Sequence, residues 1–224
     1  FEIAEKVYLD NLPEISELTY PAIQPHLHEK VCSWLKQNIS TVYMVRHAKP
    51  DYSIKEDALR PLTEDGVKAS LKLVDLFENI HIDAAFSSPY IRAVNTIKPL
   101  CDGRNILIKP VEDFKERVKG TGWVENFDTY FANQWNDFDF KIENGESFRE
   151  VQNRNVAALN KVTSANKGKT IIIGTHGFAL STLLNFYDKS FGIEASQRLI
   201  TFLPYIIKLE LIDNSLINSQ ELFL

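Results

Sequence analysis

Short apolar runs alternate with longer amphipathic stretches from about residue 41 onward, and this alternation limits the fold more than any other feature. The runs TVYMV, DAAF, NILI and TIIIG have strand length and are separated by segments long enough for helices. A chain that alternates in this way forms a mostly parallel sheet with helices on its faces. We therefore predict an α/β fold, a three-layer α/β/α sandwich, over residues 41–224. Residues 1–40 lack the pattern and are predicted to be an N-terminal extension of unknown role.

Several elements carry local signals. The run 206–211 alternates apolar residues with Lys208 and Glu210, which predicts an antiparallel strand at the sheet edge with one wet face. Residues 28–37 predict a short amphipathic helix, and an apolar stripe predicts the buried face of another, formed by Val67, Leu71, Val74 and Phe77. Four helix starts are indicated. They lie at Thr63 for the helix that carries this stripe, at Ser88 before Pro89, at Ser147 with Glu150 in a capping box, and at His176 or Gly177 for a helix ending near Tyr187.

Composition excludes several classes of protein. Apolar residues make up 44% and charged residues 25% of the chain, as in ordinary folded domains. The formal charge of −5 lacks the basic footprint of a nucleic-acid binder, and no apolar run reaches membrane-spanning length. The two cysteines, Cys32 and Cys101, form no metal or disulfide spacing. We expect a protein of the reducing cytoplasm that binds neither nucleic acid nor membrane.

Polar residues follow the predicted strands where each strand ends. Arg46 and His47 follow TVYMV, Arg92 lies one turn into the helix after DAAF, Glu116 follows NILI and a loop, and His176 follows TIIIG. Because the carboxyl ends of parallel strands share one edge of the sheet, we expect these five side chains to meet there.

Such a cluster suits chemistry on a phosphate. Two guanidiniums offer planar forks of donors to an anion, and helix N-termini add backbone N–H groups. A neutral histidine can attack phosphorus while a nearby carboxyl protonates the leaving oxygen. The arginines would stabilise the charge of the transition state, so we predict that no metal or cofactor is needed. The chain has no P-loop, G-x-G-x-x-G or G-x-S-x-G motif, which removes those alternatives.

Six short motifs resemble those of the histidine phosphatase superfamily, the phosphoglycerate mutase-like proteins. They are Arg46-His47-Ala48, RPLTEDG (60–66), SSPYIRAVNT (87–96), the region of Glu116 before GTGW, NGES (144–147) and GTHG (174–177). The resemblance spans about residues 41–211. It implies that residues 41–224 form a catalytic domain, that His47 is transiently phosphorylated, that Arg46, Arg92 and His176 bind the phosphoryl group, and that Glu116 is the proton donor and later the base.

The chain departs from the family pattern close to His47. R-H-G is R-H-A here, so the turn at Ala48 must be one that alanine can adopt, and Pro50 and Ser53 replace the usual Thr and Asn. We count Ser53 and Gly177 among the substrate-binding residues. The segment between Ser53 and Pro61 is shorter than resemblance to the glycolytic mutases implies, which favours a phosphatase.

Some interpretations stay open at this point. Glu112, Asp113 and Glu125 are alternatives to Glu116 as the proton donor. Cationic residues near it are either surface charges or binders of a second anionic group of the substrate, and these are Lys115, Arg117, Lys119 and Arg149. The aromatic residues of 120–140 either fill the core or line the pocket, and these are Trp123, Phe127, Tyr130, Phe131, Trp135, Phe138 and Phe140. His26 and His28 are expected to face solvent rather than to bind a metal.

The sequence therefore predicts a metal-independent phosphomonoesterase that acts on a small phosphorylated molecule. A phosphoglycerate mutase and a non-catalytic module that binds a phosphorylated ligand are the alternatives. The physiological substrate and the oligomeric state are not fixed by the sequence; pairing of two copies through the late edge strand is one arrangement that would give a dimer.

Overall fold

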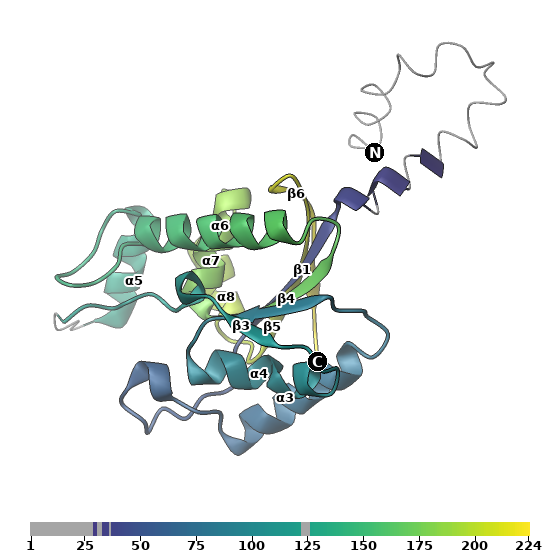
Figure 1. Cartoon of the computed structure of the whole chain (residues 1–224). Helices are drawn as coiled ribbons and strands as arrows, with labels where there is room; N and C mark the ends of the chain where they lie inside the picture. The colour runs from purple at the N-terminus through teal and green to yellow at the C-terminus, as the bar shows by residue number, and fades with distance from the viewer. Residues whose placement is uncertain (1–28, 31–32, 36, 122–125) are drawn as a thin grey trace, which may run out of the picture.

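The fold is a six-stranded sheet with helices on both faces, seen in a computed structural model that describes residues 29–30, 33–35, 37–121 and 126–224 (Figure 1). The strands are β1 (Ser40–Arg46), β2 (Ala84–Ser87), β3 (Ile108–Pro110), β4 (Thr170–Thr175), β5 (Tyr205–Ile212) and β6 (Ser215–Leu222). They lie in the order β3-β2-β4-β1-β5-β6. The strands β3, β2, β4 and β1 are parallel to one another, β5 is antiparallel to β1, and β6 is antiparallel to β5. The predicted fold class is confirmed.

The helices form two layers around this sheet. α3 (Glu64–Leu76) and α4 (Ile91–Asp102) pack together below it in Figure 1, and α6 (Phe148–Ala165), α7 (Gly177–Tyr187) and α8 (Ile193–Leu199) lie above it. α5 (Phe127–Asn136) stands beside α6, and two short 3-10 turns complete the set, η2 (Asp57–Leu59) and η3 (Glu112–Phe114). The described residues between 29 and 38 are helical, as the sequence predicted, and they lead away from the sheet (Figure 1).

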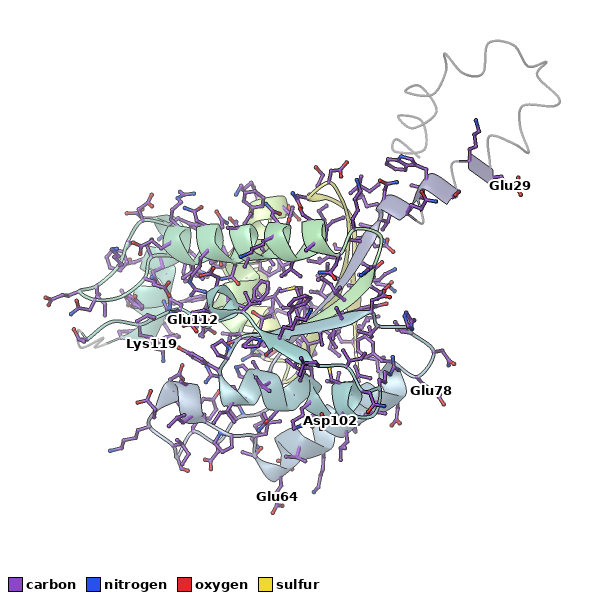
Figure 2. The ribbon with its side chains drawn as sticks, in the orientation of Figure 1. Glu29, Glu64, Glu78, Asp102, Glu112 and Lys119 are labelled. Atoms are coloured by element: carbon purple, nitrogen blue, oxygen red, sulfur yellow. The ribbon has the colours of Figure 1, made fainter. Side chains whose placement is uncertain are left out.

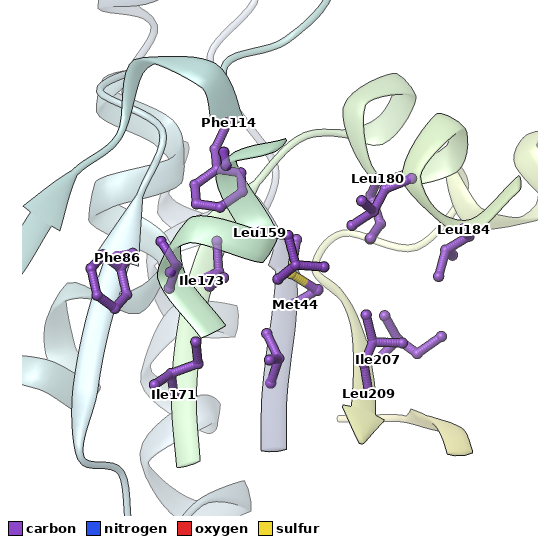
Figure 3. Close-up of a cluster of buried hydrophobic side chains, with 14 of the residues drawn as sticks. Met44, Phe86, Phe114, Leu159, Ile171, Ile173, Leu180, Leu184, Ile207 and Leu209 are labelled. Carbon is purple, nitrogen blue, oxygen red and sulfur yellow. The ribbon is translucent and has the colours of Figure 1, made fainter. Parts of the chain in front are cut away.

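The strands bury both faces because each helical layer needs an apolar partner surface. Met44, Ile171 and Ile173 face the upper layer, where Leu159 of α6 and Leu180 of α7 pack against them (Figure 3). Alternate residues of the same strands, among them Val45 and Ile172, face α3 and α4. The period of two along β1 and β4 thus builds two cores that hold the sheet in place.

Most of the predicted helix starts are confirmed. Thr63 caps α3 by accepting a hydrogen bond from the Gly66 N–H at 3.2 Å. Ser147 and Glu150 form a complete capping box at the start of α6, and α7 covers Gly177–Tyr187 as predicted. Each cap satisfies backbone donors that a helix start leaves open, and this explains why these starts were readable from local sequence.

The prediction for the start of α4 was wrong. This helix begins at Ile91 after Tyr90, two residues later than Ser88-Pro89 predicted. The Ser88 hydroxyl accepts from the Tyr90 N–H at 3.2 Å in a turn and lies 2.8 Å from His176 Nε2. A residue with the chemistry of a cap is therefore used to hold a histidine.

The predicted buried stripe of α3 was also wrong except for Phe77. Val67, Leu71 and Val74 are exposed, whereas the inner face carries Gly66, Ser70 and Leu73. Ser70 satisfies its hydroxyl by donating to the Val67 carbonyl at 2.7 Å, so a small polar residue is tolerated inside. Hydrophobicity alone therefore assigned the wrong face.

The late strand is antiparallel as predicted, but it is not at the edge. β5 pairs with β1 on one side and with β6 on the other. The sequence of β6 (SLINSQEL) is too polar for it to be predicted as a strand. A dimer therefore cannot form through β5, because both of its edges are already paired. The division of the chain at residues 40 and 41 stays a prediction.

Candidate active site

The carboxyl ends of β1, β2 and β4 open into one cavity of about 420 Å³. Arg46, His47, Arg92 and Glu116 line this cavity, and His176 lies directly behind His47 with its ring centroid 5.3 Å away. The five residues singled out as catalytic are therefore brought together at the predicted edge. Gly177 is buried beside them, where an added Cβ would lie 3.2 Å from Arg46 Nε.

His47 is fixed in one tautomer. Its Nδ1 lies 2.8 Å from the Ala48 carbonyl, and because a carbonyl only accepts, Nδ1 must carry the proton and donate. Nε2 is then left with a lone pair. Burial, followed by the charges of Arg46 and Arg92, holds the pKa of His47 well below its usual range, so the ring is neutral at pH 7. A buried, oriented imidazole with a free Nε2 is suited to nucleophilic attack.

The turn after His47 is built for alanine. Ala48 is fully buried without a positive φ, and its N–H donates to Thr96 Oγ1 at 2.9 Å. The RPLTEDG motif supports the same turn: the Thr63 N–H donates to the Lys49 carbonyl at 3.0 Å, and an added Cβ at Gly66 would lie 2.3 Å from that oxygen. The departure from R-H-G is thus accommodated by the backbone.

The two arginines are anchored differently. Arg46 donates from Nη1 to the carbonyls of Phe202 at 2.6 Å and Leu199 at 3.3 Å, which leaves its Nε without a partner. Arg92 donates from Nη1 to the Asp57 backbone carbonyl and from Nη2 to the Asp57 carboxylate at 3.1 Å. Arg92 therefore pairs with Asp57 and not with Glu64 or Asp65, the acidic residues in the first turn of α3. Both guanidiniums keep their positions because fixed acceptors hold them.

Asp57 is the cavity carboxylate that the sequence did not reveal. It pairs with Arg60 as well as with Arg92, and both arginines line the cavity beside it. Asp57 lies 35 residues before Arg92, in a segment with no recognisable motif, so no local signal pointed to this contact.

His176 is completely enclosed. Its Nε2 lies 2.8 Å from Ser88 Oγ, its ring meets Tyr90 edge-on at 5.0 Å between centroids, and its buried Nδ1 has no partner among the described residues. Burial, followed by the charges of His47 and Arg92, holds the pKa of His176 well below its usual range. His176 is therefore a neutral hydrogen-bonding group beside His47, and it does not itself line the cavity.

Glu116 is held by backbone donors at the start of α7. Its Oε1 accepts from the N–H groups of Arg117 at 2.9 Å and Ala179 at 3.1 Å, and its Oε2 accepts from Phe178 at 3.2 Å. Glu112 is instead paired with Lys115, Asp113 is exposed, and Glu125 lies outside the described residues. Of the described alternatives, only Glu116 lines the cavity.

Arg154 supports the Glu116 loop and was missed by sequence reasoning. It donates to the carbonyls of Asp113, Lys115 and Glu116 and forms an ion pair with Glu146 at 2.8 Å. The NGES motif has the same role, because the Glu146 N–H donates to the Val118 carbonyl at 2.8 Å. This motif is a scaffold for the loop rather than a part of the cavity.

The remaining candidate binding residues from the sequence differ in whether they line the cavity. Arg117 and Lys119 line the cavity, and Figure 2 shows Lys119 on the loop that leads from η3 to α5; Lys115 and Arg149 do not line it. Ser53 is exposed and is absent from the lining as well, its N–H donating to Asp51 at 2.9 Å.

The aromatic residues of 126–140 pack among themselves and against Phe148 and Phe178, with Tyr130 and Phe131 buried. None of them lines the cavity, whose aromatic residues are Tyr52, Tyr90 and Phe178.

Three residues considered in the sequence lie outside the described part of the chain, and these are Trp123, His26 and His28. Within the part of the chain that the structure describes, no helix has the length and apolarity needed to cross a membrane.

Comparison with known proteins places this site in context. The model of the histidine phosphatase superfamily (branch 1) matches residues 42–203. The uncharacterised phosphatase PhoE of Bacillus subtilis is 25% identical over 154 residues, which is 65% of this chain and 76% of that protein. A metal-independent phosphoserine phosphatase of Arabidopsis thaliana is 26% identical over 168 residues, covering 66% and 69%. The crystal structure of a phosphoglycerate mutase from Bacillus anthracis superposes with a TM-score of 0.64 at 18% identity, over 84% of this chain and 95% of that one.

Proposed function

This chain belongs to the histidine phosphatase superfamily, and on that premise we propose that it is a phosphomonoesterase that forms a phosphohistidine at His47 without a metal ion. Its family and its phosphatase relatives make it an enzyme of the phosphatase or mutase type that acts on small phosphorylated molecules. The observation that carries the finer proposal is the tautomer of His47, which leaves the Nε2 lone pair at the wall of a cationic cavity.

In the first step, Nε2 of His47 attacks phosphorus while the bond between phosphorus and the leaving oxygen breaks. Glu116, in its protonated form, gives its proton to that oxygen, and the alcohol departs. Arg46, Arg92 and His176 offer donors to the phosphoryl oxygens, whose charge is spread in the transition state. Because the arginine anchors are already in place, little reorganisation accompanies the reaction.

In the second step, Glu116 is a carboxylate and takes a proton from water as the water oxygen attacks phosphorus. The bond between phosphorus and Nε2 breaks, its electron pair returns to His47, and inorganic phosphate leaves. Nδ1 of His47 keeps its proton throughout and donates it in a hydrogen bond to the Ala48 carbonyl. Neither step needs a group that the chain does not supply.

The exposed segment beside the cavity favours a phosphatase over a mutase. A mutase must retain the dephosphorylated molecule, whereas the segment beside this cavity, residues 52–56, is exposed. The short connection between Ser53 and Pro61 supports the same conclusion. A coupled assay for interconversion of 3- and 2-phosphoglycerate tests the mutase directly.

The proposal is tested by following hydrolysis with EDTA present in the parent, in His47→Ala and in His81→Ala, whose histidine is exposed and outside the cavity. We expect turnover in the parent and in His81→Ala, and loss of at least about a thousandfold in His47→Ala. A base-stable phosphoryl label should form on the parent and on His81→Ala but not on His47→Ala. Hydrolysis by His47→Ala at the parental rate would refute the phosphohistidine mechanism. Tight binding of phosphate without turnover of any substrate would favour the binding module.

A further inference from the structure

Arg117 is a buried cation that the proposed mechanism does not use. Arg117 is only 3% exposed, yet it lines the cavity next to Glu116. Its guanidinium donates from Nη1 to the side-chain oxygen of Gln134, while Nε and Nη2 are buried without any partner. Half of this side chain is therefore anchored and half lacks an acceptor.

The anchored half is fixed firmly. Gln134 is completely buried, and its Nε2 donates to the carbonyls of Glu146 at 3.1 Å and Phe140 at 3.3 Å, so its oxygen must point to Arg117. The guanidinium carbon lies 4.7 Å from the ring of Phe178 and 4.9 Å from that of Tyr130. These rings attract the cation through their faces, but they offer no oxygen to the two open N–H groups.

The open N–H groups call for an anion. Buried donors are nearly always paired, because an unpaired one loses its hydrogen bonds to water and gains none. Glu116 does not supply the acceptor, since its oxygens accept from backbone N–H groups. An acceptor that enters through the cavity would remove this cost.

The geometry of the open groups suits a two-oxygen anion. Nε and Nη2 lie on the same edge of a guanidinium and donate in parallel, which matches a carboxylate or a phosphoryl group. Arg46 has the same arrangement, with Nη1 held by fixed carbonyls and Nε left open. Arg46, Glu116 and Arg117 all line the cavity. With the fork of Arg46 on the phosphoryl group, the fork of Arg117 is left for the leaving group.

The charge of the cavity agrees with this assignment. Six of its lining residues are lysine or arginine and two are acidic. Asp57 is already paired with Arg60 and Arg92. Once Arg46 and Arg92 hold the phosphoryl group, positive charge remains at Arg117, Lys119 and Lys55, and among the residues that the structure describes neither lysine is in an ion pair.

We infer that Arg117 is a specificity-determining residue that binds a second anionic group, a carboxylate or a second phosphoryl group, on the leaving-group part of the substrate. This inference rests on the proposed function. It limits the substrates to phosphomonoesters whose alcohol carries its own negative charge a few bonds from the leaving oxygen.

The test compares substrates that differ only in the second anion. One pair is 3-phosphoglycerate and glycerol 3-phosphate, and a second pair is fructose 1,6-bisphosphate and fructose 6-phosphate, so the two pairs separate a carboxylate from a phosphoryl group. Nitrophenyl phosphate, which has no second anion, is the reference. The variants are Arg117→Met, Arg117→Lys, which keeps the charge without the fork, and the control Arg149→Met, whose side chain is on the surface against Phe138.

We expect the parent to prefer the doubly anionic member of at least one pair. In Arg117→Met the ratio of kcat/KM within that pair should fall roughly ten- to hundredfold, as expected for losing hydrogen bonds to a charged group, and Arg117→Lys should recover only part of it. Turnover of nitrophenyl phosphate should stay within about threefold of the parent, and Arg149→Met should change neither. An unchanged ratio, or an equal loss on nitrophenyl phosphate in both Arg117 variants, would overturn the assignment.

Binding measurements keep the two proposals separable. If the parent hydrolyses nothing, the proposed function fails, but calorimetry with the same pairs still tests Arg117. The parent should then bind the doubly anionic member more tightly, and Arg117→Met should lose that preference. A parent that binds or turns over both members of each pair equally well would overturn the inference about Arg117.

Discussion

The floor and the rim of the cavity are built in opposite ways. The floor consists of Arg46, His47 and Arg92, which line the cavity, and of His176 directly behind His47. All four lie at strand ends or follow them closely and are at most 6% exposed. The rim consists of residues 52–60 and 118–119, which lie in loops and in the short turn η2 and expose residues such as Tyr52 at 64%. A buried floor fixed by backbone contacts suits one reaction, whereas an exposed rim can vary with the substrate. The difference teaches that reaction type and substrate choice are carried by separate parts of this chain.

After loss of the nucleophile itself, replacing the proton donor Glu116 should give the largest effect. This variant would show how far catalysis depends on the acid beside the floor. In Glu116→Gln, kcat for an alkyl phosphate should fall by about 10²–10⁴, because the alkoxide must then leave without a proton. Nitrophenyl phosphate should lose less, since nitrophenolate is a better leaving group. Steady-state kinetics on both substrates measures this.

The matched control is Glu112→Gln, which alters an exposed carboxylate paired with Lys115. It should leave both rates unchanged. An equal loss on the two substrates in Glu116→Gln would show that Glu116 does not protonate the leaving oxygen.

Shortening a floor arginine should have the next largest effect. Arg46→Lys keeps a positive charge but removes the planar fork, so kcat/KM should fall by about a hundredfold on every substrate. Arg104→Lys is the control, because Arg104 also donates to buried carbonyls, those of Ile80 and Phe77, but lies outside this cavity. If the loss of kcat/KM in Arg46→Lys were larger for substrates that carry a second anionic group, the separation of floor from rim would be wrong.

Acid should destabilise the protein through the floor histidines. Burial lowers the pKa of both His47 and His176, so the folded state keeps them neutral while the unfolded chain takes up protons below about pH 6.5. The unfolded state then binds more protons, and stability falls as the pH drops. Each histidine contributes up to about 1.4 kcal/mol per pH unit.

Urea unfolding between pH 5.5 and 8 measures this dependence. The free energy of unfolding should be level above about pH 7 and fall below pH 6.5, with a shallower fall in His47→Asn. A free energy of unfolding that does not change between pH 5.5 and 7 would contradict the neutral, buried histidines.

Removing a rim charge should give the smallest effect. Lys119→Met should raise KM for a doubly anionic substrate by only about twofold to fivefold, because an exposed charge is screened by solvent. This difference from the parent should shrink as salt is added, and kcat should not change. Lys189→Met, a lysine against Phe186 and outside the cavity, is the control. An effect of Lys119→Met as large as that of Arg46→Lys would remove the distinction between the two regions.

Local sequence patterns predicted the parts of the molecule that depend on neighbours in the chain. The capping box of Ser147 and Glu150 and the cap at Thr63 were readable because each donor and acceptor is three residues apart. The positions of Arg46, His47 and His176 were readable because strand ends of a parallel sheet meet at one edge. The Ser88 hydroxyl was misassigned because its actual partner, His176, lies 88 residues away.

By itself, the sequence determined the α/β class, the family and the residues of the floor, because short apolar runs and the residues that end them are local properties. Only the tertiary structure decided that Asp57 pairs with Arg92, that Arg154 holds the Glu116 loop and that Arg117, a residue of the cavity wall, keeps two buried donors without a partner. These contacts join segments far apart in the chain. Their energies depend on burial and on the direction of each donor, and neither quantity exists until the chain has folded.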